Sequence, residues 1–170
     1  QFTHALPWAA DASVAPICEQ SGDQYAARSN GTRTCCGGWQ FVYTGLIPGH
    51  AYRLEWQVRH QGIGVADDEL AAMVAWAEPA PDNVRFGTQM QWDYVFSTIV
   101  DDHTVHYAGV LVAPEGNDSL AIRNTLRWTA VGQMACAVPQ VTDLGLAPTV
   151  APVRVAVVTG KEADARTQRP

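Results

Sequence analysis

The chain has 170 residues, with 17 Asp or Glu against 11 Lys or Arg, which gives a formal net charge of −6. Hydrophobic residues make up 47 % of the chain and charged residues 16 %, a composition that excludes wholesale disorder and predicts a folded domain with its own core. The sequence has an excess of acidic residues and no basic stripe that would bind phosphates, which argues against nucleic acid as a partner. The sequence has no run of 18 apolar residues, so we expect no membrane-spanning helix.

Alternation of apolar and polar residues predicts β-strands along most of the chain. Edge strands are expected around Ile17 and Tyr25. Residues 39–44 and 51–59 are predicted to pair as a hairpin across a Pro-Gly turn. A second clear alternation covers residues 120–128, with Trp128 on the apolar face, which is predicted to form the core. Weaker patterns predict strands over 70–76, 89–96, 104–112 and 134–144, while residues 66–77 fit a helix or a strand.

About eight strands at this spacing predict an all-β fold, an antiparallel jelly-roll β-sandwich over residues 1–148. The character of the sequence changes after that point. Residues 149–170 are predicted to hold a Pro/Ala linker and an apolar strand at 153–160 that would begin a following domain. Because that strand is apolar on both faces, we expect it to pack on the sandwich, add to a sheet edge or pair two copies of the chain as a homodimer.

Four cysteines, Cys18, Cys35, Cys36 and Cys136, predict two disulfides and a secreted or periplasmic location. A bond between the neighbours Cys35 and Cys36 would be strained. We favour Cys18 with Cys35 and Cys36 with Cys136 over the remaining pairing. The alternative interpretation is four buried free thiols.

Several segments together resemble a known family: residues 126–134, 141–144 and 153–158, with shorter matches at 38–39 and 49–53. They are similar to the N-terminal β-sandwich domain that precedes a carbon-nitrogen hydrolase (nitrilase-like) domain in some bacterial secreted proteins. That sandwich is in turn similar to jelly-roll carbohydrate-binding modules. The resemblance implies a non-catalytic accessory module of a larger secreted enzyme, with the hydrolase domain C-terminal to it. It also implies a structural calcium ion at Asp143, near the last strand; no other cofactor is expected.

Candidate ligand-binding residues come from two places in the chain. Aromatic side chains beside polar loops can stack on a sugar ring while planar polar groups bind its hydroxyls; these residues are Trp76, Trp92 and Tyr94 with Gln91 and Asp93. If strands 51–59 and 120–128 are neighbours, their polar face forms a band that would bind sugars or carboxylates or dock the hydrolase domain. That band includes Arg53, Gln57 and Arg127. The alternatives are ordinary rim aromatics and a solvated salt-bridge ladder.

No catalytic motif is present, so we do not expect an enzyme. The densest polar cluster is residues 101–106, in which His103 and His106 would point to opposite faces of a strand. Two other functions stay open: a structural or docking domain of a carbon-nitrogen hydrolase without a glycan ligand, and a small secreted enzyme that uses the Asp/His cluster.

Overall fold

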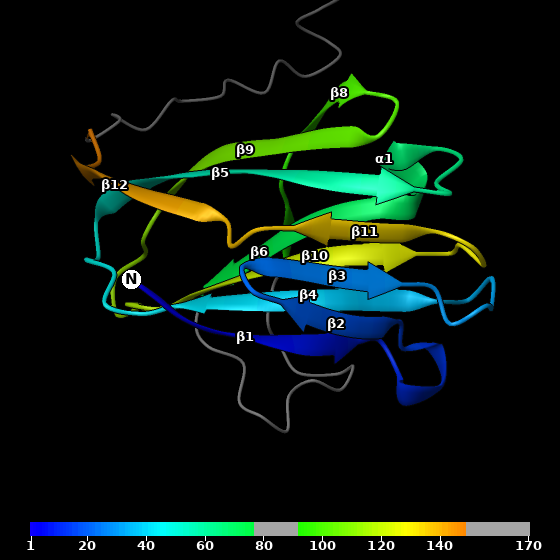
Figure 1. Cartoon of the computed structure of the whole chain (residues 1–170). Helices are drawn as coiled ribbons and strands as arrows, with labels where there is room; N and C mark the ends of the chain where they lie inside the picture. Colours follow the sequence, from blue (N-terminus) through cyan, green and yellow to red (C-terminus); the bar gives the residue numbers. More distant parts are fainter. Residues whose placement is uncertain (77–91, 149–170) are drawn as a thin grey trace, which may run out of the picture.

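The structure, a computed structural model, describes residues 1–76 and 92–148, and nearly all of its regular elements are β-strands (Figure 1). Two short helical turns, a 3₁₀ turn at Ala12–Val14 and α1 at Ala66–Glu69, interrupt them. The strands are β1 (Phe2–Ala9), β2 (Ile17–Ser21), β3 (Gln24–Arg28), β4 (Cys36–Tyr43), β5 (His50–Gln61), β6 (Leu70–Trp76), β7 (Asp93–Tyr94), β8 (Ser97–Asp101), β9 (Thr104–Val112), β10 (Leu120–Arg127), β11 (Gln133–Cys136) and β12 (Gln140–Leu146).

Two antiparallel sheets form the sandwich. Sheet A has the strand order β1-β4-β10-β6-β7, and sheet B has the order β2-β3-β11-β5-β9-β8, with β12 also paired to β5. The predicted all-β antiparallel sandwich is confirmed. The described residues form twelve strands where about eight were predicted, partly because the predicted strand at 134–144 is divided into β11 and β12 at Pro139, which has no N–H for a ladder.

The core lies between the sheets. Along β5 the residues Tyr52, Leu54, Trp56 and Val58 are buried, while the residues between them are exposed, as expected for a strand with one solvated face. The core side chains opposite them come from β4 and β10 of sheet A and include Trp39, Phe41, Tyr43, Leu120, Ile122 and Leu126.

A buried hydrogen bond joins the two layers. Asn124 of β10 is 1 % exposed, accepts from Trp56 Nε1 of β5 at 2.9 Å, and donates to Cys136 Sγ of β11 at 3.0 Å. Sheet A is therefore tied to two strands of sheet B through one amide, whose polar atoms would otherwise be unsatisfied in the core.

The predicted hairpin of residues 39–44 and 51–59 is wrong. Strand β4 belongs to sheet A and β5 to sheet B, so the segment around Pro48 and Gly49 crosses between the layers. Residues 37–43 of β4 are all buried, which suits a strand paired on both edges inside sheet A. Strands β5 and β10 are likewise in different sheets, so the proposed polar band across them does not form.

Trp128 also differs from its prediction. Strand β10 ends at Arg127, and Trp128 follows with a φ of +58°, a left-handed conformation that turns the chain out of the alternation. Its side chain is 63 % exposed instead of lying in the core.

The predicted disulfides are absent among the described residues, which include all four cysteines, and each of them is a free thiol. Cys35 lies in the core, whereas its neighbour Cys36 lies on the other side of the strand beside Arg127. Cys136 is in the core, bonded to Asn124, so Cys36 and Cys136 are separated by sheet A. Cys18 Sγ donates to the Gly38 carbonyl at 3.3 Å.

The predicted linker and apolar strand at 149–170 lie outside the described residues, so the boundary at 148 stays a prediction. Within residues 1–76 and 92–148, no helix has the length and apolar character needed to cross a membrane.

The free-thiol state of the four cysteines predicts how many of them an alkylating reagent modifies. Burial raises the pKa of Cys18 to about 11 and that of Cys136 to about 12, so little reactive thiolate forms at pH 8. We expect mass spectrometry after alkylation without reductant to show four modified cysteines in the unfolded protein and much slower modification in the native protein. A product with only two or no modified cysteines after unfolding would contradict the free-thiol state.

Asn124 should carry a large share of stability. Asn124→Ala leaves Trp56 Nε1 without its acceptor and opens a cavity, so we expect a loss of about 2–4 kcal/mol in the free energy of unfolding in urea. Asn117→Ala, in the turn before β10, is the matched control and should cost less than about 0.5 kcal/mol. In a double-mutant cycle with Trp56→Phe, additive losses would show that the hydrogen bond contributes nothing.

Candidate functional site: a polar groove across sheet B

The outer face of β5 carries a run of planar polar side chains. Five successive outward positions are exposed, and their side chains end in guanidinium, carboxylate or amide groups: Arg53, Glu55, Gln57, Arg59 and Gln61. Their spacing of two residues places all of them on the face of sheet B that points away from the core.

Small side chains lie beside this run. The ladder pairs Arg59 with Ala135 of β11, and Ala135 with Ala26 of β3. Residues paired in an antiparallel sheet share one face, so the two alanines form a low floor next to the long side chains of β5. Both alanines are partly buried.

Two depressions follow this floor and meet at Arg59 and Ala135. One has a volume of about 440 Å³ and the other about 320 Å³, sizes typical of small-ligand sites. We call the two together the polar groove. The polar side chains that line it are Gln24, Glu55, Gln57, Arg59, His106 and Gln140 in the first depression, and Glu19, Arg28, Arg59, His60, Gln61 and Gln133 in the second.

Some groove side chains bind each other and others are free. His106 Nε2 lies 3.2 Å from Glu55 Oε1, and Gln133 Nε2 donates to Gln61 Oε1 at 2.7 Å. Within the described residues, the side chains of Gln57 and Arg59 have no such partner. Free planar groups of this kind can form paired hydrogen bonds with ligand hydroxyls or carboxylates.

No Trp, Tyr or Phe ring faces into the groove from its described lining. Trp56 contributes to the lining but is only 6 % exposed, stacks on Tyr107 with ring centroids 5.3 Å apart, and binds Asn124 beneath the sheet. A ligand in the groove would therefore be held by hydrogen bonds and charge rather than by ring stacking.

The predicted ligand residues are divided between two faces. Arg53 and Gln57 lie on the groove face of β5, and Gln57 lines the groove itself. Trp92 and Tyr94 lie at β7, the edge of sheet A, with Asp93 between them. Trp76 packs against the core, and Gln91 lies outside the described residues.

An arginine side chain, that of Arg123, covers one face of the Trp92 ring. The Arg123 guanidinium lies 3.9 Å from the centroid of the Trp92 ring and 4.3 Å from that of Trp8, and its Nε donates to Gln40 Oε1 at 2.8 Å. Burial lowers the pKa of Arg123 to about 10, which leaves it charged at neutral pH. One face of the Trp92 ring is thus covered by protein and is not open to a sugar.

Arg127 is similarly engaged by the protein. Its Nε and one terminal nitrogen donate to the backbone carbonyls of Asp68 and Asp67 at 2.7 and 2.9 Å. Its guanidinium also lies 4.8 Å from the centroid of the Trp128 ring. These contacts favour a structural role for Arg127 at the end of β10.

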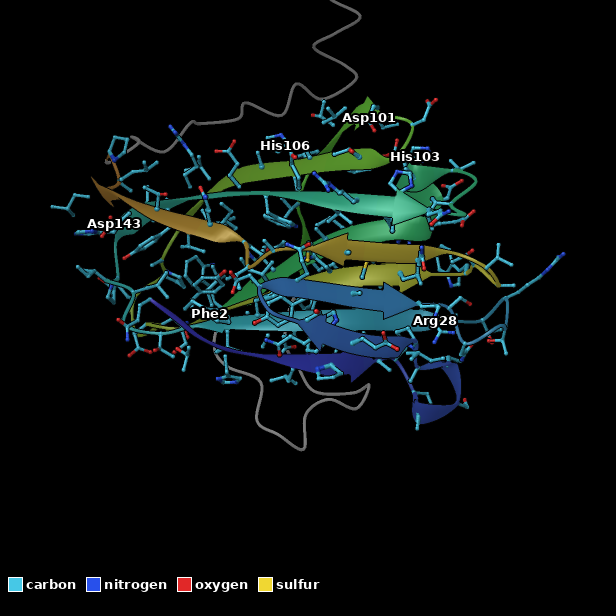
Figure 2. All side chains as sticks on the ribbon, in the orientation of Figure 1. Phe2, Arg28, Asp101, His103, His106 and Asp143 are labelled. Carbon is cyan, nitrogen blue, oxygen red and sulfur yellow. The ribbon has the colours of Figure 1, made fainter. Side chains whose placement is uncertain are left out.

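Asp143 lies at the far end of sheet B from the β8–β9 hairpin (Figure 2). Its carboxylate is 3.0 Å from His50 Nδ1 and accepts from the Gly145 N–H at 2.7 Å, and these contacts lower its pKa. Calcium prefers six to eight oxygen ligands, and the described residues contain no group of three acidic, histidine or cysteine side chains placed to hold a metal. Calcium binding at Asp143 stays a prediction.

The members of the Asp/His cluster lie at different places on the β8–β9 hairpin. Figure 2 places Asp101 and His103 at the turn and His106 midway along β9. Asp101 Oδ1 accepts from the His103 N–H at 2.8 Å, and the His103 ring lies near that of His60, with centroids 6.3 Å apart. His106 instead contacts Glu55 on the groove face, so the two histidines do not converge on one point.

Known proteins resemble this chain in structure. No family model and no curated protein sequence matches the chain. A family 4 carbohydrate-binding module superposes with a TM-score of 0.51 at 12 % identity, covering 82 % of this chain and 86 % of that one. The enzymatically active domain of tailspike protein 4 from bacteriophage CBA120 gives a TM-score of 0.51 at 12 % identity, covering 83 % of this chain and 19 % of that one. This chain thus spans about a fifth of the length of the tailspike fragment.

The fold is that of a carbohydrate-binding-module-like β-sandwich, which confirms this part of the family resemblance. At such low identity the likeness concerns the fold alone. The same fold occurs within an enzymatically active tailspike fragment, so the fold alone does not define the function. The association with a nitrilase-like domain stays a prediction.

The stacked arginine gives a prediction for stability. Arg123→Lys keeps the charge but loses the planar group between two indoles, so we expect a loss of about 1–2 kcal/mol in the free energy of unfolding. The control Arg53→Lys, on the exposed face of β5, should change it by less than about 0.5 kcal/mol. Equal effects of the two exchanges in urea denaturation would show that stacking does not stabilise the fold.

Proposed function

We propose that this domain is a non-catalytic carbohydrate-binding-like module whose ligand lies in the polar groove of sheet B. The observation that carries the proposal is the groove itself: free planar side chains of β5 beside a floor formed by Ala26 and Ala135. Such groups match the close, paired hydroxyls of a sugar ring. The likeness in fold to a carbohydrate-binding module supports the same function.

The non-catalytic part of the proposal rests on the Asp/His cluster. A small enzyme that used it would need Asp101, His103 and His106 to reach one substrate. His103 lies at the hairpin turn near His60, whereas His106 contacts Glu55 on the outer face. No reacting atom could touch both rings at hydrogen-bond distance without a change of the hairpin.

The accessory role is also part of the proposal. We infer a module of a larger secreted enzyme, with a hydrolase domain following residue 148, from the family resemblance of the sequence. A groove open on the outer face of sheet B would allow the module to hold a polysaccharide while a linked domain acts elsewhere. A purely structural domain would lack any glycan ligand, which the following experiment distinguishes.

We expect the isolated chain to bind at least one polysaccharide in a glycan array or in affinity electrophoresis. Gln57→Ala removes a free groove amide, and should weaken binding by about tenfold, because a lost hydrogen bond of about 1.4 kcal/mol corresponds to that factor. Its free energy of unfolding should not change, since the side chain is exposed.

Trp92→Ala is the matched comparison on the opposite layer. If the groove holds the ligand, this exchange should leave affinity for the polysaccharide within about twofold, while lowering stability through the lost contact with Arg123. Weaker binding for Trp92→Ala with normal binding for Gln57→Ala would place the ligand on sheet A. A failure to bind any glycan would favour the structural domain.

A further inference from the structure

Arg59 occupies the centre of the polar groove and lacks a charged neighbour. It lines both depressions, at the point where they meet. Its four neighbours on the outer face are uncharged: Gln57 and Gln61 lie before and after it on β5, and Thr104 and Ala135 are paired with it across the sheet. Its guanidinium is in no salt bridge among the described residues. The carboxylate in the same row of the sheet, that of Asp101, lies one strand further out and is hydrogen-bonded to Thr104.

The other charged side chains of the groove are paired. Glu19 faces Arg28 at 3.9 Å, and Glu55 faces His106 at 3.2 Å. Glu55 is four residues from Arg59 along the strand, or about 13 Å at 3.3 Å per residue. Arg28 is paired with Glu19, and the Glu55–His106 contact is an ion pair only when the histidine is protonated. Among the described lining residues, Arg59 is thus the arginine without an acidic partner, in a protein whose formal net charge is −6.

We propose that Arg59 binds a carboxylate of the ligand, and that the groove takes acidic, uronate-containing polysaccharides. This inference rests on the function proposed above and names its substrate class. A guanidinium and a carboxylate are both planar and form two parallel charge-assisted hydrogen bonds. The neutral amides on either side of Arg59 provide hydrogen-bonding groups for the hydroxyls of the same or the adjacent sugar rings.

The floor allows the carboxylate to reach this position. Ala135, paired with Arg59, and Ala26, paired with Ala135, have no side-chain atoms beyond Cβ, so the space above them is open to a ligand. A sugar ring lying over the two alanines would have its carboxylate beside Arg59. Because the overall negative charge repels an acidic polymer, binding of such a polymer would have to come from a local positive site of this kind.

The test compares two forms of one polymer by affinity electrophoresis and calorimetry: polygalacturonate, and the same backbone with its carboxyl groups methyl-esterified. We expect the wild-type chain to bind the acidic form at least tenfold more tightly, with affinity falling as NaCl is raised. Arg59→Gln keeps a planar hydrogen-bonding group without the charge and should bring the two affinities to within about twofold of each other. Arg59→Lys should keep part of the preference.

Arg53→Gln is the matched control, since Arg53 lies on the same face of the same strand but does not line either depression. It should retain the preference. A wild-type chain that binds both polymer forms equally, or only neutral glycans, would overturn the uronate inference and leave the proposed function standing. A preference that survives Arg59→Gln, or is lost equally in Arg53→Gln, would also overturn it.

Sulfated glycans test the nature of the anion. Tighter binding of a sulfated polymer than of any carboxylated polymer, including alginate, would contradict a carboxylate site. Absence of binding to every glycan, acidic or neutral, would overturn the proposed function together with this inference.

Discussion

The whole of sheet B depends on the pairing of β5. This twelve-residue strand pairs with β9 along one edge and with β11 and then β12 along the other. Its strict alternation fixes the direction of every side chain, so the apolar residues bury against sheet A while the planar polar residues face outward. A shift of one residue in its register would exchange the two sets and destroy both the core and the groove. Stability and the candidate site are consequently specified by the same periodic pattern.

For this reason the sequence predicts the alternation of β5 and the class of fold. It does not predict which strands pair with each other. Residues 39–44 and 51–59 looked like a hairpin because a Pro-Gly turn follows the first strand, yet the turn carries the chain to the other sheet. The residues of a turn do not determine whether the two strands beside it pair or lie in different sheets, since that choice depends on strands elsewhere in the chain. Here β10 and β1 occupy the two edges of β4.

The site was only partly predictable for a related reason. Arg53 and Gln57 could be placed on a polar face from β5 alone, but the groove also needs Ala26 and Ala135, which the ladder brings beside Arg59 from β3 and β11. The residues that surround Ala26 and Ala135 in the sequence do not indicate that the two alanines lie side by side at the bottom of a groove. The aromatic residues point to a different place, because Trp92 lies against Arg123 at sheet A rather than in the groove; their role in binding stays a prediction. The disulfide prediction failed for another reason: an even number of cysteines is compatible with disulfides but does not require them, and all four thiols are free.

The alanine floor can accept amino-acid substitutions without damage to the fold. Ala26 and Ala135 point away from the core, so larger side chains at these two positions would fill solvent rather than disturb the packing between the sheets. One exchange to an aromatic residue would add a stacking platform, and one exchange to a charged residue would alter the sign of the surface. The sandwich therefore separates the residues that maintain the fold from those that select a ligand, and a lineage or a designer can vary the second group while the first stays constant.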